Sequence, residues 1–142
     1  MKIIEKILLG LLGIGTLLIL FGLPFAAPVV AITGAVLMLW YFPFGFLTLK
    51  GQPEEGKIKG YPMLAGFALF NGSMVFMYLI LNWPFAASMR IYGTVLPLAV
   101  LCYSLVKSNS KDFSSYHGAM KVRSGILFVL VTFAAIRLMI IQ

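Results

Sequence analysis

The stretch 7–23, ILLGLLGIGTLLILFGL, contains no charged residue, and Thr16 is its single hydroxyl-bearing side chain. A helix needs about 20 predominantly apolar residues to cross the hydrocarbon core of a bilayer, and about 17 are enough at the lower limit. This stretch therefore predicts a membrane-crossing helix that begins close to the N-terminus.

Four further stretches have the same character, at 28–49, 61–82, 86–106 and 124–141. Of the 142 residues, 61% are hydrophobic and only 11% are charged, against about 25% charged in an ordinary soluble domain. So few charges cannot coat a surface that faces water. The sequence predicts an all-α fold, a polytopic membrane helix bundle with five transmembrane helices.

Basic residues gather in three segments: before the first span, in the connector 50–60 and in the connector 107–123. With five spans all three segments fall on one side, whereas four spans would place one of them on the wrong face. We therefore expect the N-terminus inside and the C-terminus outside, in a bacterial inner membrane. The net charge of +7 is then explained by the basic residues that membrane proteins carry on their cytoplasmic side, and no nucleic-acid partner is expected.

A cleaved signal peptide is the competing interpretation of the first span. The candidate cleavage site has Phe25 where a small residue is needed, and Pro28 follows the cut. The first span is therefore expected to be retained.

The hexads LPFAAP at 23–28 and WPFAAS at 83–88 recur at an offset of sixty residues. The same offset aligns the first two spans with the third and fourth, and it aligns the two basic connectors. We expect one transmembrane domain over 1–142, with a possible internal parallel repeat of 7–49 and 67–106 and a fifth helix outside the repeat. Convergence of two Pro-containing turns on one composition is the alternative.

Small residues mark faces on which helices can approach closely. Ala27, Ala31 and Ala35 recur every four positions, and the first span has small residues at Gly10, Gly13 and Gly15. These faces predict helix packing, within one chain or between chains.

Polar residues recur at helical spacing on the third and fourth spans, and Pro97 is expected to kink the fourth. A hydrated polar cleft is one interpretation, and ordinary hydrogen bonding between helices is the preferred one. The residues are Asn71, Tyr78 and Asn82 on the third span and Arg90, Thr94 and Ser104 on the fourth.

Arg90 and Arg137 fall about one turn inside the predicted outer interface, and no predicted span contains a carboxylate. The simpler interpretation is that both side chains extend to lipid phosphates. The functional interpretation is an anion- or lipid-binding site with Asn82 and Thr94, because a guanidinium binds phosphate and carboxylate well. The C-terminal carboxylate at Gln142 is a third candidate partner.

No catalytic pattern, metal-ligand spacing or cofactor motif is recognisable. Cys102 and His117 are the only residues of their types, and Glu5 and His117 are expected at the interface or in a polar loop. Trp40 and Tyr41 suit the aromatic belt at the membrane interface.

These features predict a non-enzymatic structural or accessory subunit of a membrane assembly that self-associates or joins a membrane-protein partner. The alternative is a small oligomeric transporter or channel for an anionic solute or lipid, and a membrane-disrupting effector is a more distant third.

Overall fold

The computed structural model describes residues 3–42, 61–108 and 114–141. Over these ranges the chain is helical and has no strand, as predicted, and the number of helices agrees with the five that were expected. The helices are α1 (Ile3–Leu20), α2 (Ala26–Tyr41), α4 (Tyr61–Ile80), α5 (Ala86–Ser108) and α6 (Ser114–Ile141). The connector 50–60 and its lysines lie outside the described residues.

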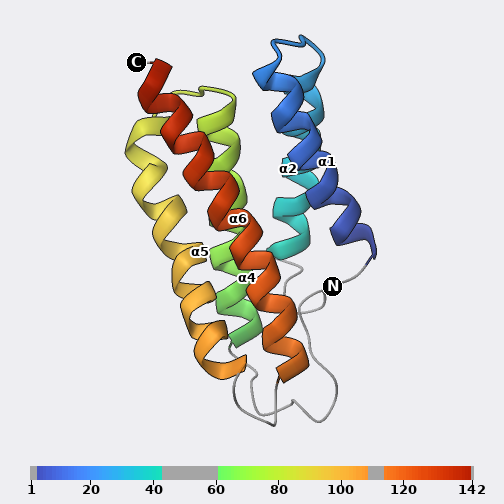
Figure 1. The fold of residues 1–142 in the computed structure, drawn as a ribbon, viewed down its shortest axis with the longest axis vertical. Coiled ribbons are helices and arrows are strands. Elements are labelled where there is room, and N and C mark those ends of the chain that lie inside the picture. The colour runs from blue at the N-terminus through green and yellow to red at the C-terminus, as the bar shows by residue number, and fades with distance from the viewer. Residues whose placement is uncertain (1–2, 43–60, 109–113, 142) are drawn as a thin grey trace.

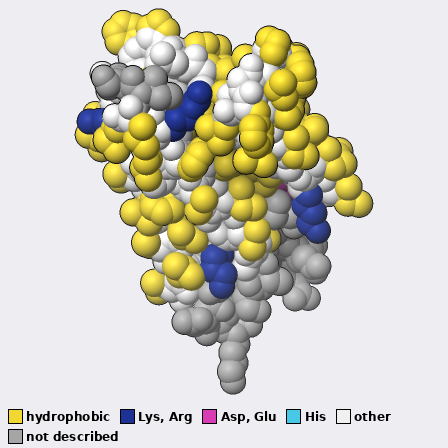
Figure 2. Space-filling model, turned by 45° about the horizontal axis from the view of Figure 1, so that its top comes forward, with side chains coloured by type: hydrophobic (Ala, Val, Ile, Leu, Met, Phe, Trp, Pro, Cys, Tyr) yellow, Lys and Arg dark blue, Asp and Glu magenta, His cyan; other side chains and the backbone are white. Residues whose placement is uncertain are grey.

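Four of these helices, α1, α4, α5 and α6, are long and apolar enough to cross a membrane, which indicates an integral membrane protein. Helix α2 has 16 residues, or about 24 Å at the helical rise, and is shorter than a hydrocarbon core of about 30 Å. The predicted second span continues over 43–49, outside the described residues. Apolar side chains cover most of the described surface in view in Figure 2.

Helix α4 is central, because it packs against α2 on one side and against α5 and α6 on the other (Figure 1). Helix α1 packs against α2, so the α1–α2 hairpin stands beside the three-helix group α4–α5–α6. The α1–α2 turn, the α4–α5 turn and the C-terminus lie at one end, which we call the turn end (Figure 1).

Close approach of α4 and α5 depends on glycine. A Cβ atom added to Gly93 would lie 2.3 Å from Cγ1 of Val75, and one added to Gly72 would lie 2.7 Å from Cγ of Pro97. Neither distance is compatible with a side chain at these two positions. Glycines thus bring the two backbones together as small residues do at interfaces between membrane helices.

The two turns at the turn end make the same backbone hydrogen bonds at an offset of sixty residues. In each turn a residue with positive φ follows the helix, and the next N–H reaches back five residues, as in a Schellman motif. The positive-φ residues are Gly22 (φ 73°) and Asn82 (φ 52°), and the bonds run from Leu23 N–H to Leu18 O (3.1 Å) and from Trp83 N–H to Tyr78 O (2.9 Å).

The turns differ at their last residue. Phe85 has a positive φ of 66°, whereas Phe25, sixty residues earlier, has a φ of −80°. The shared helix ends agree with a repeated hairpin, and they also agree with two independent turns of one type. Duplication of the hairpin stays a prediction.

The predicted loop 107–123 needs correction, because much of it is helical. Helix α5 continues to Ser108, and α6 begins at Ser114, ten residues before the predicted start of the fifth span. Hydropathy finds only the apolar part of a helix. The polar first turns of α6 remain helical and carry His117 and Arg123, which are both buried.

Candidate functional site

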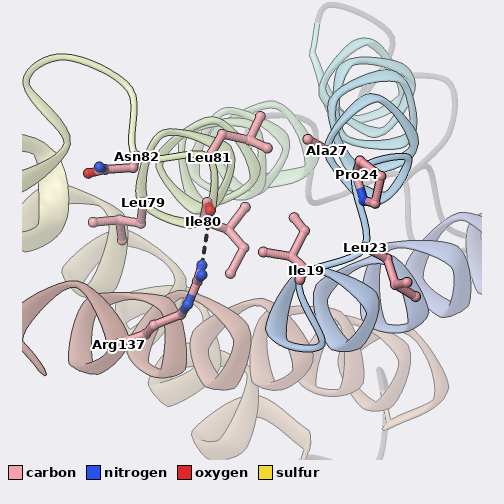
Figure 3. A pocket seen from close by; sticks show the side chains of 10 residues that line it. Ile19, Leu23, Pro24, Ala27, Leu79, Ile80, Leu81, Asn82 and Arg137 are labelled. Atoms are coloured by element: carbon pink, nitrogen blue, oxygen red, sulfur yellow. Dashed lines mark hydrogen bonds between the residues drawn. The ribbon is translucent and has the colours of Figure 1, made fainter. Parts of the chain in front are cut away.

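A pocket of about 370 Å³ lies at the turn end, where the α1–α2 turn meets the C-terminus of α4 and the last turns of α6 (Figure 3). Its lining is apolar except for Asn82 and Arg137. The other lining residues are Ile19, Gly22, Leu23, Pro24, Ala27, Leu79, Ile80 and Leu81.

Arg137 of α6 extends toward the end of α4, where its Nη1 donates a hydrogen bond to the Ile80 carbonyl at 3.2 Å (Figure 3). A cation at the C-terminus of a helix is stabilised by the unpaired carbonyls there. The guanidinium has further N–H donors, and none of them bonds a described residue. Arg137 is half-buried, and its remaining N–H groups lie at the pocket without a bond to a described residue.

Glu5 is the only residue with a carboxylate side chain in the described part of the chain. It forms an ion pair with Arg123, and Arg90 and Arg137 therefore have no carboxylate partner among the described residues. At the pocket, the positive charge of Arg137 is not neutralised by any described side chain.

Of the residues predicted for an anion site, the pocket lining includes Arg137 and Asn82. The exposed Asn82 amide points away from the guanidinium (Figure 3). Arg90 is half-buried on α5 and does not line the pocket, and the hydroxyl of Thr94 donates to the Arg90 carbonyl at 2.9 Å. One anion site shared by both arginines stays a prediction.

The predicted cleft residues make local contacts. Asn71 Nδ2 donates to the Phe67 carbonyl of its own helix at 2.8 Å, and the ring of Tyr78 meets Trp83 edge-on with centroids 5.2 Å apart. Ser104 is fully buried. None of the three lines the pocket, and a polar cleft that joins them stays a prediction.

A buried polar cluster of Glu5, Tyr41 and Arg123 joins α1, α2 and α6. Arg123 Nη2 donates to Glu5 Oε2 at 2.8 Å, its Nε bonds Glu5 Oε1, and Tyr41 Oη donates to the same Oε1 at 3.0 Å. Glu5 and Tyr41 are fully buried, and Arg123 is 4% exposed. The carboxylate therefore accepts from two partners that lie on different helices.

This cluster corrects three expectations. Glu5 is buried and not solvated, Tyr41 is buried inside the protein and not on its surface, and α1 does contain a carboxylate within its apolar segment. Hydropathy placed the start of the span after Glu5, and the partner arginine is 118 residues away along the chain. One feature of the sequence could have indicated this pair. Glu5 is an acidic residue next to a predicted span, and basic residues are predicted on the same side of the membrane.

His117 is also buried, at 1% exposed, and its ring contacts Tyr103 with centroids 6.0 Å apart. The prediction of a surface histidine was wrong, because the segment is part of α6 and not of a loop. Over the ranges that the structure describes, no group of His, Cys, Asp and Glu residues has the arrangement of a metal site.

The predicted alanine face of α2 is only partly covered by the described helices. Ala27 and Ala35 are exposed and Ala31 is half-buried. On α1 a Cβ added to Gly10 would meet nothing within 4 Å, whereas one added to Gly15 would lie 2.7 Å from Val30 Cγ2. The chain uses some of its small residues internally and leaves others uncovered.

The chain matches no protein-family model, no curated protein and no solved structure. Its function is therefore inferred from the geometry of the described residues.

Proposed function

We propose that this chain is a small non-enzymatic membrane protein that self-associates as a structural or accessory subunit of a membrane assembly. The observation that supports this proposal is the alanine face of α2, composed of Ala27, Ala31 and Ala35, which no other described helix covers completely.

In a bilayer, an uncovered face of small residues allows another helix to pack closely against it. Lipid tails are as apolar as leucine, so helices associate through close packing and not through the hydrophobic effect. This chain already uses that device internally, where Gly93 meets Val75 and Gly15 meets Val30. A second copy that packs on the alanine face would bring two α2 backbones into similar proximity.

The proposed setting is a bacterial inner membrane, with the turn end outside. The basic segments support this orientation, because Lys6 lies near the start of α1, Lys107 in the last turn of α5 and Lys121 near the start of α6. The parallel repeat of 7–49 and 67–106 is part of the proposal, and the matching hydrogen bonds of the two turns support it.

Leucine substitutions on the alanine face test self-association. We expect the wild-type protein to form dimers or larger oligomers in lipid nanodiscs. Ala31→Leu and Ala35→Leu should shift it toward monomers, because a leucine prevents close backbone approach. Mass photometry over a series of protein-to-lipid ratios measures the change.

Val36→Leu is the matched control, because Val36 is also exposed on α2 but lies outside the alanine face. It should leave the oligomer unchanged. A wild-type protein that stays monomeric at every ratio would contradict the proposal, and so would equal disruption by Val36→Leu.

A small oligomeric transporter or channel for an anionic solute or lipid is the second candidate, supported by the Arg137 pocket. Transport requires in addition a path across the bilayer. Flux of a fluorescent anion into protein-containing vesicles, compared with empty vesicles, distinguishes this candidate from a purely structural role.

A further inference from the structure

We propose that the pocket at the turn end binds one anionic phospholipid, with its phosphate on Arg137 and the first part of an acyl chain on the apolar wall opposite. This inference rests on the anion-binding candidate above for the charge of Arg137, and it requires neither transport nor self-association.

The charge is the first step. Arg137 is half-buried, gives one hydrogen bond to the Ile80 carbonyl and has no carboxylate partner among the described residues. An arginine at membrane depth is costly unless its charge is paired or reaches the interface. A guanidinium forms paired, charge-assisted hydrogen bonds with phosphate oxygens, so a phosphate group matches the donors that remain.

The apolar wall is the second step. Ile19 and Pro24 of the α1–α2 hairpin lie across the pocket from Arg137, whereas the Leu23 side chain points away from it (Figure 3). A free phosphate would leave these side chains in contact with water, and a neutral hydrocarbon would leave the guanidinium unpaired. An anionic amphiphile satisfies both surfaces at once.

The size of the pocket decides how much of the lipid enters. A volume of about 370 Å³ lies near the lower end of the range of ligand pockets, about 300–1,000 Å³. It has room for a headgroup phosphate and the beginning of a chain, and the rest of the lipid remains in the bilayer. The binding mode is therefore a lipid anchored at one end.

The position of the pocket is the third step. It lies where the α1–α2 hairpin meets the three-helix group, and its walls come from α1, the α1–α2 turn, the first turn of α2, the C-terminal end of α4 with the turn that follows it, and α6. The main described packing between these two parts is of α2 against α4, and Glu5 near the start of α1 also pairs with Arg123 of α6. A lipid in the pocket would add contacts between α1 and α6 at the turn end, so binding is expected to raise the unfolding temperature.

Native mass spectrometry of the delipidated full chain tests the proposal, with phosphatidylglycerol and phosphatidylcholine added at equal concentrations. We expect one phosphatidylglycerol per protomer and at least about tenfold weaker binding of phosphatidylcholine, the change for about 1.4 kcal/mol. Arg137→Gln should abolish this preference, because the amide cannot replace the charge.

Lys121→Gln is the control, because Lys121 is also cationic and half-buried, lacks a carboxylate partner among the described residues and does not line the pocket. It should bind phosphatidylglycerol like the wild type. Equal loss of preference in both variants, or no preference in the wild type, overturns the proposal.

Two further measurements separate the proposal from its alternatives. Ile19→Ala, which shortens a half-buried side chain of the wall that points toward Arg137, should weaken lipid binding even if Arg137→Gln fails to fold. Inorganic phosphate should not compete with the lipid at millimolar concentration, and competition would indicate a free-anion site and overturn the proposal. The same spectra report the oligomer, so loss of lipid with the oligomer intact is distinguishable from failure of self-association.

Discussion

Glu5, Tyr41 and Arg123 show how single side chains connect separate helices of this fold. A buried charge is stable only when it is paired and its remaining hydrogen-bonding capacity is satisfied. Glu5 meets this condition through Arg123 and Tyr41, and the three residues belong to three helices. The cluster connects the first described helix to the last, although α1 packs mainly against α2.

At the residue scale we expect Glu5→Gln to lower the free energy of unfolding by about 3–5 kcal/mol, because it leaves Arg123 buried without a counter-charge. Tyr41→Phe removes one hydrogen bond and should cost about 1 kcal/mol. Unfolding in mixed micelles of a mild detergent and dodecyl sulfate measures both changes.

Lys6→Gln is the control for this prediction, because Lys6 neighbours Glu5 in sequence and is exposed. Its effect should remain within about 0.5 kcal/mol. The double variant Glu5→Leu with Arg123→Leu should lose less stability than the sum of the single variants, since no charge is left unpaired. Wild-type stability in Glu5→Gln would show that the pair does not hold the helices together.

At the element scale, α5 contacts α4 where Gly93 meets the rigid side chain of Val75. Val75 is β-branched and has little rotamer freedom, so it cannot move away from a new methyl group at Gly93. Gly34 is also in close contact, but its neighbour is the flexible side chain of Met77. An added methyl group should therefore be tolerated better at Gly34 than at Gly93.

We expect Gly93→Ala to destabilise the protein by about 1–3 kcal/mol through overpacking, and Gly34→Ala to cost less. Adding Val75→Ala to Gly93→Ala should recover part of the loss by making room for the methyl group. Unfolding in mixed micelles again provides the measurement.

Gly118→Ala is the matched control, because a Cβ at this helical glycine meets nothing within 4 Å. It should be neutral or slightly stabilising, since alanine is the better helix former. Equal unfolding free energies for Gly93→Ala and Gly118→Ala would show that α4 and α5 leave room for a methyl group at Gly93.

At the scale of the whole molecule, the alternation of helices and the basic segments favour the predicted orientation. The C-terminus lies at the turn end (Figure 1). Lys6, Lys107 and Lys121 lie near the other ends of α1, α5 and α6. Positive residues are retained on the cytoplasmic side, so the turn end is expected outside.

Cysteine labelling in intact cells checks this orientation. In a Cys102→Ser background, Gln142→Cys should react with a membrane-impermeant maleimide added outside, whereas Lys2→Cys should react only after permeabilisation. Labelling of Gln142→Cys only after permeabilisation would reverse the predicted topology or remove one span.

The helical class, the membrane environment and the positions of the turns followed from sequence patterns, because these properties are local. Apolar segments must satisfy their backbone hydrogen bonds internally in lipid, so they become helices wherever they are long enough. Pro24 and Pro84 indicated both turns in the same way. The start of α6 was misplaced, since hydropathy does not detect a polar but helical segment such as Ser114–Arg123.

The candidate site was predictable only in part, through Arg137 and Asn82. The position of both residues near the predicted outer interface could be seen in the sequence. The wall opposite Arg137, however, comes from Ile19 and Pro24, more than a hundred residues earlier. No pattern along the chain brings these positions together.

The sequence by itself thus determined that this protein is a membrane helix bundle, because charge depletion and apolar length act segment by segment. The tertiary structure alone decided that Glu5 is buried against Arg123, that Gly93 is used internally while Gly10 is open, and that Arg137 faces an apolar wall. These outcomes depend on which helix faces meet, and a face acquires its partner only when distant segments pack.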